Sequence, residues 1–466
     1  MIELYLILVP AVFALLIFLT RRSLLIRRLL LLGALCHLGG VAFLLFRIGK
    51  TNSLFADWLA ADVPGAIVIA ICSLLFLASS INAYFWIPAA RKFEGEHATM
   101  PEHVFCSVLC LFLATMSLVV FAANFGLLWV AVEATTLASA PLIAYHRSRG
   151  AIEAMWKYLI ICSVGIGLAL FGTFMLGAAL RFSGSPVTDL SFAAFETAGK
   201  GLNIQWFKAA FLFCLAGYGL KMGLAPFHVW LPDAHSEAPS LVSVLLSGSL
   251  LNCSFLGVTR VIKISPESLL PFCREYLIAF GLLSLLIAAC FIIRQTDFKR
   301  MLAYSSVEHM GLIAVLWGLG STEFTFMHMI GHSACKMILF LTAGNILLAY
   351  GTRKCSQVTG LFSSMPLTAF VWIAGILFIC GAPPSPLFVT ELFLIQKAGP
   401  VLGGIILFLL FAIFCGMTSI ALKMTMGKAE NPPPAEAAAA ASGLTLLPAL
   451  LGLLPASAGL YFIFQL

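Results

Sequence analysis

The sequence has very little charge for its length. Of its 466 residues only 10% are charged, whereas 61% are hydrophobic, and the mean hydropathy is +1.04. A typical soluble domain carries about 25% charged residues. The composition therefore excludes an ordinary soluble domain and predicts an all-α membrane protein that crosses the bilayer many times.

The sequence also lacks the short motifs of cofactor chemistry. It has no dinucleotide-binding glycine fingerprint, no phosphate-binding P-loop and no HExxH zinc motif, and its 13 cysteines form no CxxC pair. Scattered thiols in apolar helices are usually small apolar fillers. We therefore expect no cofactor, metal, iron–sulfur cluster or structural disulfide in this chain, so any redox centre belongs to other chains.

A removable leader and a nucleic-acid partner are not expected either. The first 20 residues are apolar but have no basic start and no small-residue cleavage site, so they predict a first membrane helix. The net charge of +7 lies mostly in short loops between helices. More Lys and Arg lie in one set of alternate loops, which includes RRSLLIRR, and this bias predicts that both termini face the outer side.

The apolar runs are long enough to cross about 30 Å of hydrocarbon. Fourteen spans are predicted near residues 2–20, 29–46, 64–87, 103–121, 125–145, 152–180, 206–224, 240–262, 275–293, 301–317, 324–349, 365–396, 400–424 and 444–464. Only Ala122, Ala123 and Asn124 separate two of them.

Two of the predicted spans are interrupted by proline. The first break is at Ala225-Pro226, and the second is at residues 381–386, GAPPSP. Paired breaks of this kind indicate the working site of an inverted-repeat transporter, although they also occur as plain kinks. We predict four segments: N-terminal helices 1–102, repeats 103–262 and 275–424 with five helices each, and a flexible Pro/Ala linker with a last helix at 425–466.

Charged residues inside the apolar spans are the main candidates for function. Lys221 lies within an apolar run just before the first break, and an ammonium group at membrane depth costs about 2.5–3.5 kcal/mol on insertion scales. Glu133 lies in the middle of an earlier span. We predict that the two pair, so that the pair holds a proton when closed and releases it when opened. A static ion pair, or a Glu133 carboxyl bonded to a nearby Thr or Ser, is the alternative.

One later span carries three titratable residues on one face. His328, His332 and Lys336 are spaced by four, which places them on one stripe of a helix. The stripe indicates a proton path. Metal binding by the two histidines is the alternative, but no third ligand accompanies them as it does in HExxH; satisfied polar packing is another.

Further polar residues flank these spans. Glu391 follows the second break and would exchange protons with Lys336 or the outer side, or simply bond to backbone groups that the break frees. Glu308 and His309 would feed a proton inlet or contact a partner subunit. The pair Glu153 and Lys157, four residues apart, indicates a local ion pair.

The segment after the first break contains a histidine between two carboxylates. His235 changes charge near neutral pH and could carry protons on from Lys221, with Asp233 and Glu237 beside it. Asn252 lies where the relay needs a link between Lys221 and Lys336. Asn does not titrate, so water would have to carry the proton past it.

Four motifs in this order resemble one known family. They are KMGLAPFHVWLPDAHSEAPS, QTDFKRMLAYSSVEHMG, the His/Lys span HMIGHSACKM, and GAPPSPLFVTELFLI. The chain resembles the proton-translocating antiporter-like subunits of respiratory complex I, Mrp-type sodium/proton antiporters and energy-converting membrane-bound hydrogenases, over roughly residues 100–425. This resemblance implies fourteen helices with two inverted five-helix repeats.

The resemblance also implies roles for single residues. Glu133 corresponds to the family's helix-five glutamate and Lys221 to its helix-seven lysine, while Lys336 corresponds to the helix-eleven lysine and Glu391 to the charged residue of helix twelve. Asn252 replaces a lysine that complex I relatives often carry. Glu308-His309 and the short chain look more like the formate hydrogenlyase and group 4 hydrogenase branch, in an inner position of the subunit row.

The expected function is therefore ion translocation, of protons first, by a membrane subunit of an energy-converting [NiFe] hydrogenase or formate hydrogenlyase in a prokaryotic cytoplasmic membrane. The nickel–iron and iron–sulfur centres would lie in partner subunits. The alternatives are an Mrp-type sodium/proton antiporter, a complex I subunit, or a structural relative that binds a soluble zinc enzyme.

Overall fold

The protein is helical wherever it is described. The structure is a computed structural model, and it describes residues 1–47, 57–93, 99–183, 189–198 and 201–463. Over these ranges the regular elements are helices, and the only β pairing consists of isolated bridges. The predicted all-α class is confirmed.

The predicted spans agree with the helices in number. Twelve helical segments of the described residues are long and apolar enough to cross a membrane. The α13 helix is also long enough but carries polar residues such as Glu308, and α17 contains a non-helical residue, Gly399 (φ 79°), that divides it into two parts. Counting α13 and both parts of α17 gives the predicted fourteen.

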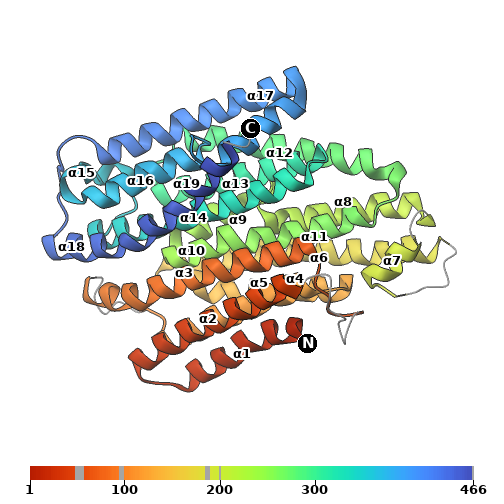
Figure 1. Cartoon of the computed structure of the whole chain (residues 1–466), viewed down its shortest axis with the longest axis horizontal. Helices are drawn as coiled ribbons and strands as arrows, with labels where there is room; N and C mark the ends of the chain where they lie inside the picture. The colour runs from red at the N-terminus through yellow and green to blue at the C-terminus, as the bar shows by residue number, and fades with distance from the viewer. Residues whose placement is uncertain (48–56, 94–98, 184–188, 199–200, 464–466) are drawn as a thin grey trace. The chain divides into compact units, whose positions relative to one another are not determined.

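The chain forms two compact units, which we describe separately. Unit 1 comprises Met1–Leu77, Met100–Trp230 and Ser249–Leu277. Its helices are α1 (Ile2–Leu19), α2 (Ser23–Arg47), the first part of α3 (Val63–Phe93), α4 (Glu102–Phe121), α5 (Phe125–Ile143), α6 (Arg149–Arg181), α7 (Phe192–Ala198), α8 (Ile204–Met222), the 3-10 turn η2 (Phe227–Val229), α11 (Leu251–Lys263) and the turn η4 (Glu267–Leu269). The α1, α2 and α4 helices lie side by side, and α6 packs on α5 and α8 (Figure 1).

Unit 2 comprises Ala78–Thr99, Leu231–Gly248 and Ile278–Leu466. Its helices are the second part of α3, α9 (Trp230–Glu237), α10 (Ser240–Leu245), most of the π-helical turn η3 (Leu246–Leu250), the second part of α12 (Leu270–Ile292), α13 (Phe298–Gly318), α14 (Thr322–Tyr350), η5 (Cys355–Gln357), α15 (Leu361–Ser364), α16 (Pro366–Ile379), α17 (Pro386–Thr425), α18 (Ala435–Leu444) and α19 (Leu446–Ile463). The α14 helix contacts α10, α13, α16, α17, α18 and α19, so it is the central helix of this unit.

Both predicted breaks are present. The α8 helix ends at Met222, Gly223 adopts a left-handed conformation (φ 86°), and a 3-10 turn leads into α9. The α16 helix ends at Ile379. Gly381 (φ 70°), Pro383 and Pro384 precede α17, and Pro386 is its first residue. Glycine is suited to both positions because positive φ disfavours residues with a Cβ.

Polar side chains fix where several helices begin. Asn124 separates α4 from α5, and its side chain accepts hydrogen bonds from the amides of Gly126 at 2.8 Å and Leu127 at 3.4 Å. Asp297 accepts the amides of Lys299 and Arg300 at the start of α13. These caps satisfy amides that have no partner inside the helix. The two predicted spans on either side of Asn124 are therefore separate helices.

The prediction of a flexible linker at residues 425–443 is wrong in part. The run AEAAAAASGL forms the α18 helix, which directly follows Pro434. Alanine has the highest helix propensity of all residues, and five consecutive alanines therefore favour a helix over an irregular linker.

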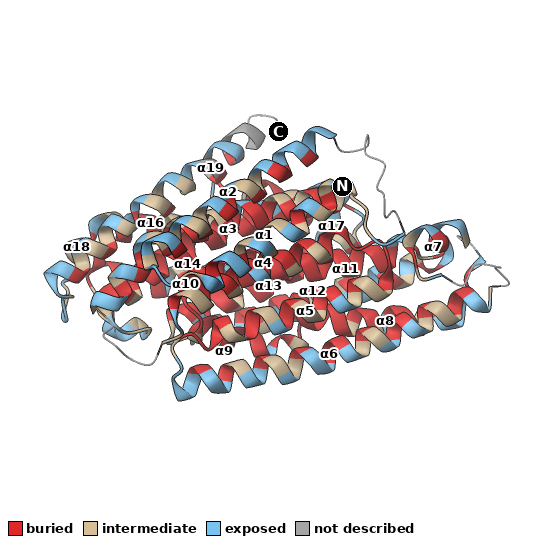
Figure 2. Cartoon of the chain, turned by 90° about the horizontal axis from the view of Figure 1, so that it is seen from below, coloured by how far each residue is buried: buried red, intermediate tan, exposed pale blue. Residues whose placement is uncertain are grey.

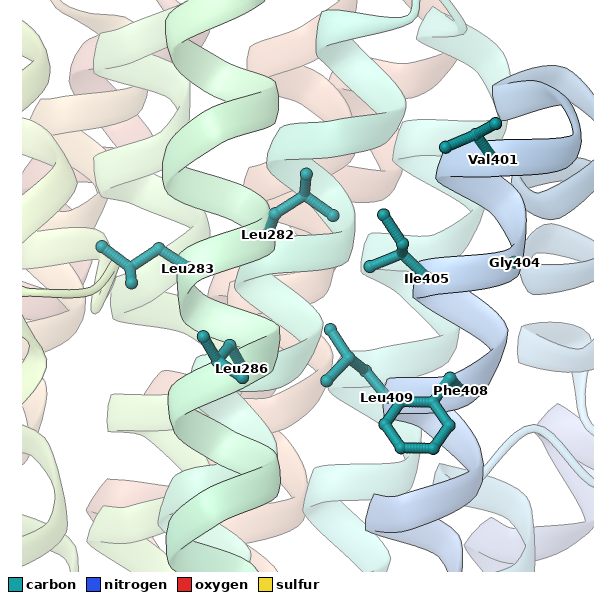
Figure 3. A pocket seen from close by; sticks show the side chains of 8 residues that line it. All are labelled: Leu282, Leu283, Leu286, Val401, Gly404, Ile405, Phe408 and Leu409. Carbon is teal, nitrogen blue, oxygen red and sulfur yellow. The ribbon is translucent and has the colours of Figure 1, made fainter.

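Burial separates central helices from peripheral ones. Figure 2 shows largely buried surfaces on α13 and α14, and exposed stripes along α6 and α19. An apolar groove between α12 and α17 is lined by residues that include Leu282, Leu286, Ile405 and Leu409, and Leu282 points toward Ile405 across it (Figure 3). Exposed apolar stripes of this kind are expected where helices contact lipid.

Candidate functional site

Lys221 is fully buried in unit 1, one turn before the first break. Its exposed fraction is 0%, and its ammonium group donates hydrogen bonds to Thr136 Oγ1 at 2.8 Å and Tyr158 OH at 2.6 Å. The ammonium also lies 4.6 Å from the centre of the Tyr158 ring. A buried charge needs such hydrogen-bonding partners to offset the cost of losing its hydration.

Tyr158 extends this hydrogen-bonded chain. Its hydroxyl lies 2.6 Å from Ser139 Oγ, and Ser139 lies 2.6 Å from the carbonyl of Thr135. A hydroxyl has one hydrogen. If Ser139 gives its hydrogen to that carbonyl, Tyr158 donates to Ser139 and accepts from Lys221.

Glu133 reaches Lys221 through Thr136 rather than directly. Thr136 donates to Glu133 Oε2 at 3.3 Å, and Ser163 donates to Glu133 Oε1 at 2.7 Å. The bonds from Thr136 and Ser163 match the alternative given for Glu133, a carboxyl bonded to a nearby Thr or Ser. The predicted pair with Lys221 is not a direct contact, because a threonine oxygen lies between the two charges. Both groups still belong to one chain of polar contacts.

Glu133 also differs from the other charged residues in its exposure. It is half-buried, and Ser163 is exposed, as are the neighbouring Val130 and Ile160. Its carboxylate thus lies at the exposed surface of α5 and α6, in the middle of the α5 span. The other members of the predicted relay are buried.

The predicted stripe on α14 lies in the core of unit 2. His328, His332 and Lys336 are each 0% exposed. The Lys336 ammonium donates to the carbonyl of Leu302 at 2.6 Å and to the hydroxyl of Ser305, both on α13. Glu308, on the same helix, is close enough for its charge to attract that of Lys336.

The histidines of α13 and α14 form a cluster. His309 Nδ1 lies 3.0 Å from His328 Nε2, and the His309 ring centre lies 5.0 Å from that of His332. His328 Nδ1 is 2.8 Å from Thr390 Oγ1 on α17. Glu308 and His309 are thus buried inside unit 2, and the alternative that they contact a partner subunit is wrong.

Glu391 lies against the second break. Its exposed fraction is 8%. A Cβ atom placed on Gly381 would come within 2.2 Å of Glu391 Oε2, so the carboxylate touches the backbone of the break. Atoms of His309, His328 and Glu391 that can bind metals lie within 4.8 Å of one another. This group does not include His332, so among the described residues it gives the pair His328 and His332 no third ligand; it joins His328 to residues of two other helices instead.

His235 and its two acidic neighbours have separate environments. His235 is 0% exposed and stacks on Phe340 of α14, with ring centres 5.0 Å apart. Asp233 pairs with Arg300, and Glu237 accepts a bond from Arg353 at 2.8 Å. The carboxylates thus anchor α9 to basic residues, whereas the imidazole faces the core of unit 2.

Two remaining candidates lie in unit 1. Asn252 is buried in α11, and its place in a relay stays a prediction. Glu153 and Lys157 form an ion pair of 2.6 Å on the exposed surface of α6, so the predicted local pair is confirmed.

The sequence reasoning missed the hydroxyl groups of the site. Thr136 is three residues after Glu133 on one helix, and this spacing could have identified it. Tyr158, Ser305 and Thr390 come from other helices, and no local pattern points to them.

Fold and site together define a polytopic helical membrane protein with buried lysines, imidazoles and carboxylates beside two broken helices, as in antiporter-like membrane subunits. The comparisons with known proteins agree. Residues 122–418 match the transmembrane family "NADH:quinone oxidoreductase/Mrp antiporter". The chain belongs to this family, and the resemblance seen in its four motifs is confirmed.

Individual relatives support the same family assignment. The hydrogenase-4 component F homolog of Methylacidiphilum infernorum is 33% identical over 367 residues, which cover 77% of this chain and 75% of that protein. Among solved structures, a chain of the archaeal membrane-bound sulfane sulfur reductase has a TM-score of 0.84 at 21% identity and covers 98% of this chain and 94% of its own. A chain of the Mrp complex from Dietzia has a TM-score of 0.82 at 18% identity, with 97% and 94% covered. These structures share the fold.

Proposed function

We propose that this chain moves protons across a prokaryotic cytoplasmic membrane as one subunit of an energy-converting [NiFe] hydrogenase or formate hydrogenlyase. The observation that carries the proposal is the fully buried Lys221 beside a broken helix, bonded to Thr136 and Tyr158 and linked to Glu133. Buried ionisable residues inside membrane helices mark ion paths because their burial costs several kcal/mol otherwise.

In the proposed mechanism, the proton on Lys221 is held by its two hydroxyl partners and by the nearby charge of Glu133. A movement of the broken helix that lengthens these bonds favours the neutral amine, since desolvation disfavours the ammonium form. Restoring the bonds favours proton uptake. Thr136 and Tyr158 can accept from the ammonium and donate onward, so they orient the proton path.

Unit 2 contains a second set of such groups. Lys336 is bonded to Ser305 and attracted by Glu308, and His328 and His332 precede it on α14. We propose that His235, Lys336, these histidines and Glu391 carry protons within this unit. Both nitrogens of His235 have no hydrogen-bond partner among the described side chains and backbone. Buried imidazoles of this kind are suited to exchange protons through water.

The name of one relative, the hydrogenase-4 component F homolog that is 33% identical to this chain, supports the hydrogenase assignment, with nickel–iron and iron–sulfur centres in partner subunits. The alternatives are an Mrp-type sodium/proton antiporter and a complex I subunit. Purification of the tagged chain with its partners distinguishes them. Nickel and iron–sulfur subunits support our proposal, whereas a set of small antiporter subunits overturns it.

We also propose a surface for a membrane partner. Glu133 and Ser163 lie on the exposed face of α5 and α6 among exposed apolar residues such as Val130 and Val164. A half-exposed carboxylate at mid-membrane is unfavourable in lipid. A neighbouring subunit that brings a hydrogen-bond donor to Glu133 would cover it. Cysteine crosslinking from Val164 in the assembled complex tests this contact.

The proposed topology has both termini on the outer side and two repeats, 103–262 and 275–424, each with one broken helix. The distribution of basic loop residues supports the orientation. Reporter fusions after residue 425 test it, because a cytoplasmic reporter is expected to be active there and a periplasmic reporter inactive.

Replacement of Lys221 tests the function itself. Lys221→Met keeps the length of the side chain but cannot hold a proton. In membrane vesicles containing the assembled complex, we expect electron transfer driven by the partner subunits to continue, with acidification of the lumen lost. Lys157→Met, at the exposed surface of α6, is the matched control. Normal acidification by Lys221→Met would overturn the proposal.

A further inference from the structure

Three helices of unit 2 bring imidazole and carboxylate groups to one buried point. His309 lies on α13, His328 on α14 and Glu391 on α17, and their nitrogen and oxygen atoms are within 4.8 Å of one another. The exposed fractions are 0%, 0% and 8%. His332 lies one turn from His328 and has its ring centre 5.0 Å from that of His309.

The hydrogen bonds around His328 direct a lone pair into this cluster. Thr390 Oγ1 donates to the carbonyl of Leu387 at 2.9 Å, so it accepts from His328 Nδ1 at 2.8 Å. The neutral ring then has its lone pair on Nε2, the atom that lies 3.0 Å from His309 Nδ1. A hydroxyl that accepts a bond from the other ring nitrogen and so fixes the orientation of the imidazole is typical of histidines that bind metals.

One oxygen of the buried Glu391 carboxylate, Oε1, makes no hydrogen bond to the described residues. His309 and His332 interact with the backbone at Ile379 and Ser247, respectively. Each buried polar atom without a partner is unfavourable. A small divalent cation would satisfy the carboxylate and the imidazoles together.

We propose that this cluster is a binding site for Zn²⁺, with His309, His328 and Glu391 as ligands and His332 or a water molecule in the fourth position. Zinc prefers four ligands from imidazole nitrogen, thiolate and carboxylate. The inference rests on the proposed function in one respect: zinc on these lone pairs would stop proton transfer through the cluster.

The second break offers a route for the cation. Glu391 touches Gly381, and the adjacent Pro383 is exposed. The carboxylate thus lies directly beneath a partly exposed, non-helical segment. A cation that enters at this segment would meet Glu391 before the two imidazoles.

Equilibrium binding of Zn²⁺ to the purified full-length chain in lipid nanodiscs tests the site. We expect one tightly bound zinc per chain, measured by competition with a chromophoric chelator, and zinc–nitrogen distances of about 2.0–2.1 Å by X-ray absorption. The isosteric Glu391→Gln and the His309→Gln variants should bind at least tenfold more weakly. Thr390→Val should weaken binding by about tenfold, because it removes the hydroxyl that accepts a hydrogen bond from His328 Nδ1.

His37→Gln is the matched control, because His37 is also buried in a helix but bonds to Ser73 and Ser117 in unit 1. It should bind zinc as the unaltered chain does. If His309→Gln fails to fold, Glu391→Gln and Thr390→Val still test whether the cluster binds zinc. Absence of bound zinc, or equal binding by these variants and the control, would overturn the site.

The binding measurement needs no turnover, so it separates the site from the proposed function. Zinc that binds through Glu391 and also stops acidification by vesicles supports both. Zinc that binds through Glu391 and leaves acidification unchanged supports the site and overturns the proton route through the cluster.

Discussion

The threonine between Glu133 and Lys221 gives the sharpest test of the proton path. Thr136→Val preserves shape but removes the oxygen that accepts from Lys221 at 2.8 Å and donates to Glu133 at 3.3 Å. Lys221 would keep only its bond to Tyr158. The buried charge would therefore lose one of its two hydrogen bonds.

The expected decrease in the rate of proton translocation follows from the energy of such hydrogen bonds. Hydrogen bonds to charged groups contribute about 1.5–3 kcal/mol, and about 1.4 kcal/mol corresponds to a factor of ten. We expect proton translocation by Thr136→Val to be slower by about tenfold to a hundredfold. Thr136→Ser retains the hydroxyl and should recover most of the rate.

The assay is acidification of vesicles that contain the assembled complex, followed with a pH-sensitive dye and normalised to electron transfer. Thr425→Val is the control, since Thr425 is equally buried but bonds only to carbonyls of its own helix. The double variant Thr136→Val/Glu133→Gln should slow proton translocation by less than the two separate effects combined, because both changes interrupt one chain of contacts. An unchanged rate in Thr136→Val would refute the bridging role.

Three further predictions concern the supports of the site. Arg260→Met should lower the unfolding temperature of the purified protein by several degrees, because the guanidinium donates to the carbonyls of Val119, Val120 and Ala122 at the end of α4, each bond contributing about 1.5–3 kcal/mol; Arg181→Met at the α6 end is the control, and equal temperatures would contradict the capping role. Arg353→Ala should slow translocation at unchanged assembly, because Arg353 bonds Glu237 and the Ser236 carbonyl and so holds α9, while its half-exposed ion pair contributes at most about 1 kcal/mol to stability; a rate equal to that of Lys354→Ala would count against it. Gly381→Ala should reduce acidification as strongly as Glu391→Gln does, because the added Cβ would displace the carboxylate and positive φ disfavours alanine, whereas Gly404→Ala meets no atom within 4 Å and should be neutral.

Much of the architecture could be predicted from the chain itself. Apolar runs of membrane length, the Asn124 cap between two helices, and the prolines at residues 226 and 383–386 are local features, because a helix in lipid must satisfy its own backbone. The four-residue spacing of His328, His332 and Lys336 is local as well, and these residues lie where the helical period places them. The α18 helix is also a local feature, because the helix propensity of its alanines favours a helix directly after the prolines.

Other features depended on contacts between distant helices. Only the folded chain places Thr136 and Tyr158 around Lys221, and only it brings His309 and Glu391 to His328. Sequence spacing specifies which side chains share a face of one helix, but not which face of another helix lies opposite. Hydrogen bonds act over about 3 Å, so the partners of a buried charge are decided by packing between helices that are far apart in the sequence.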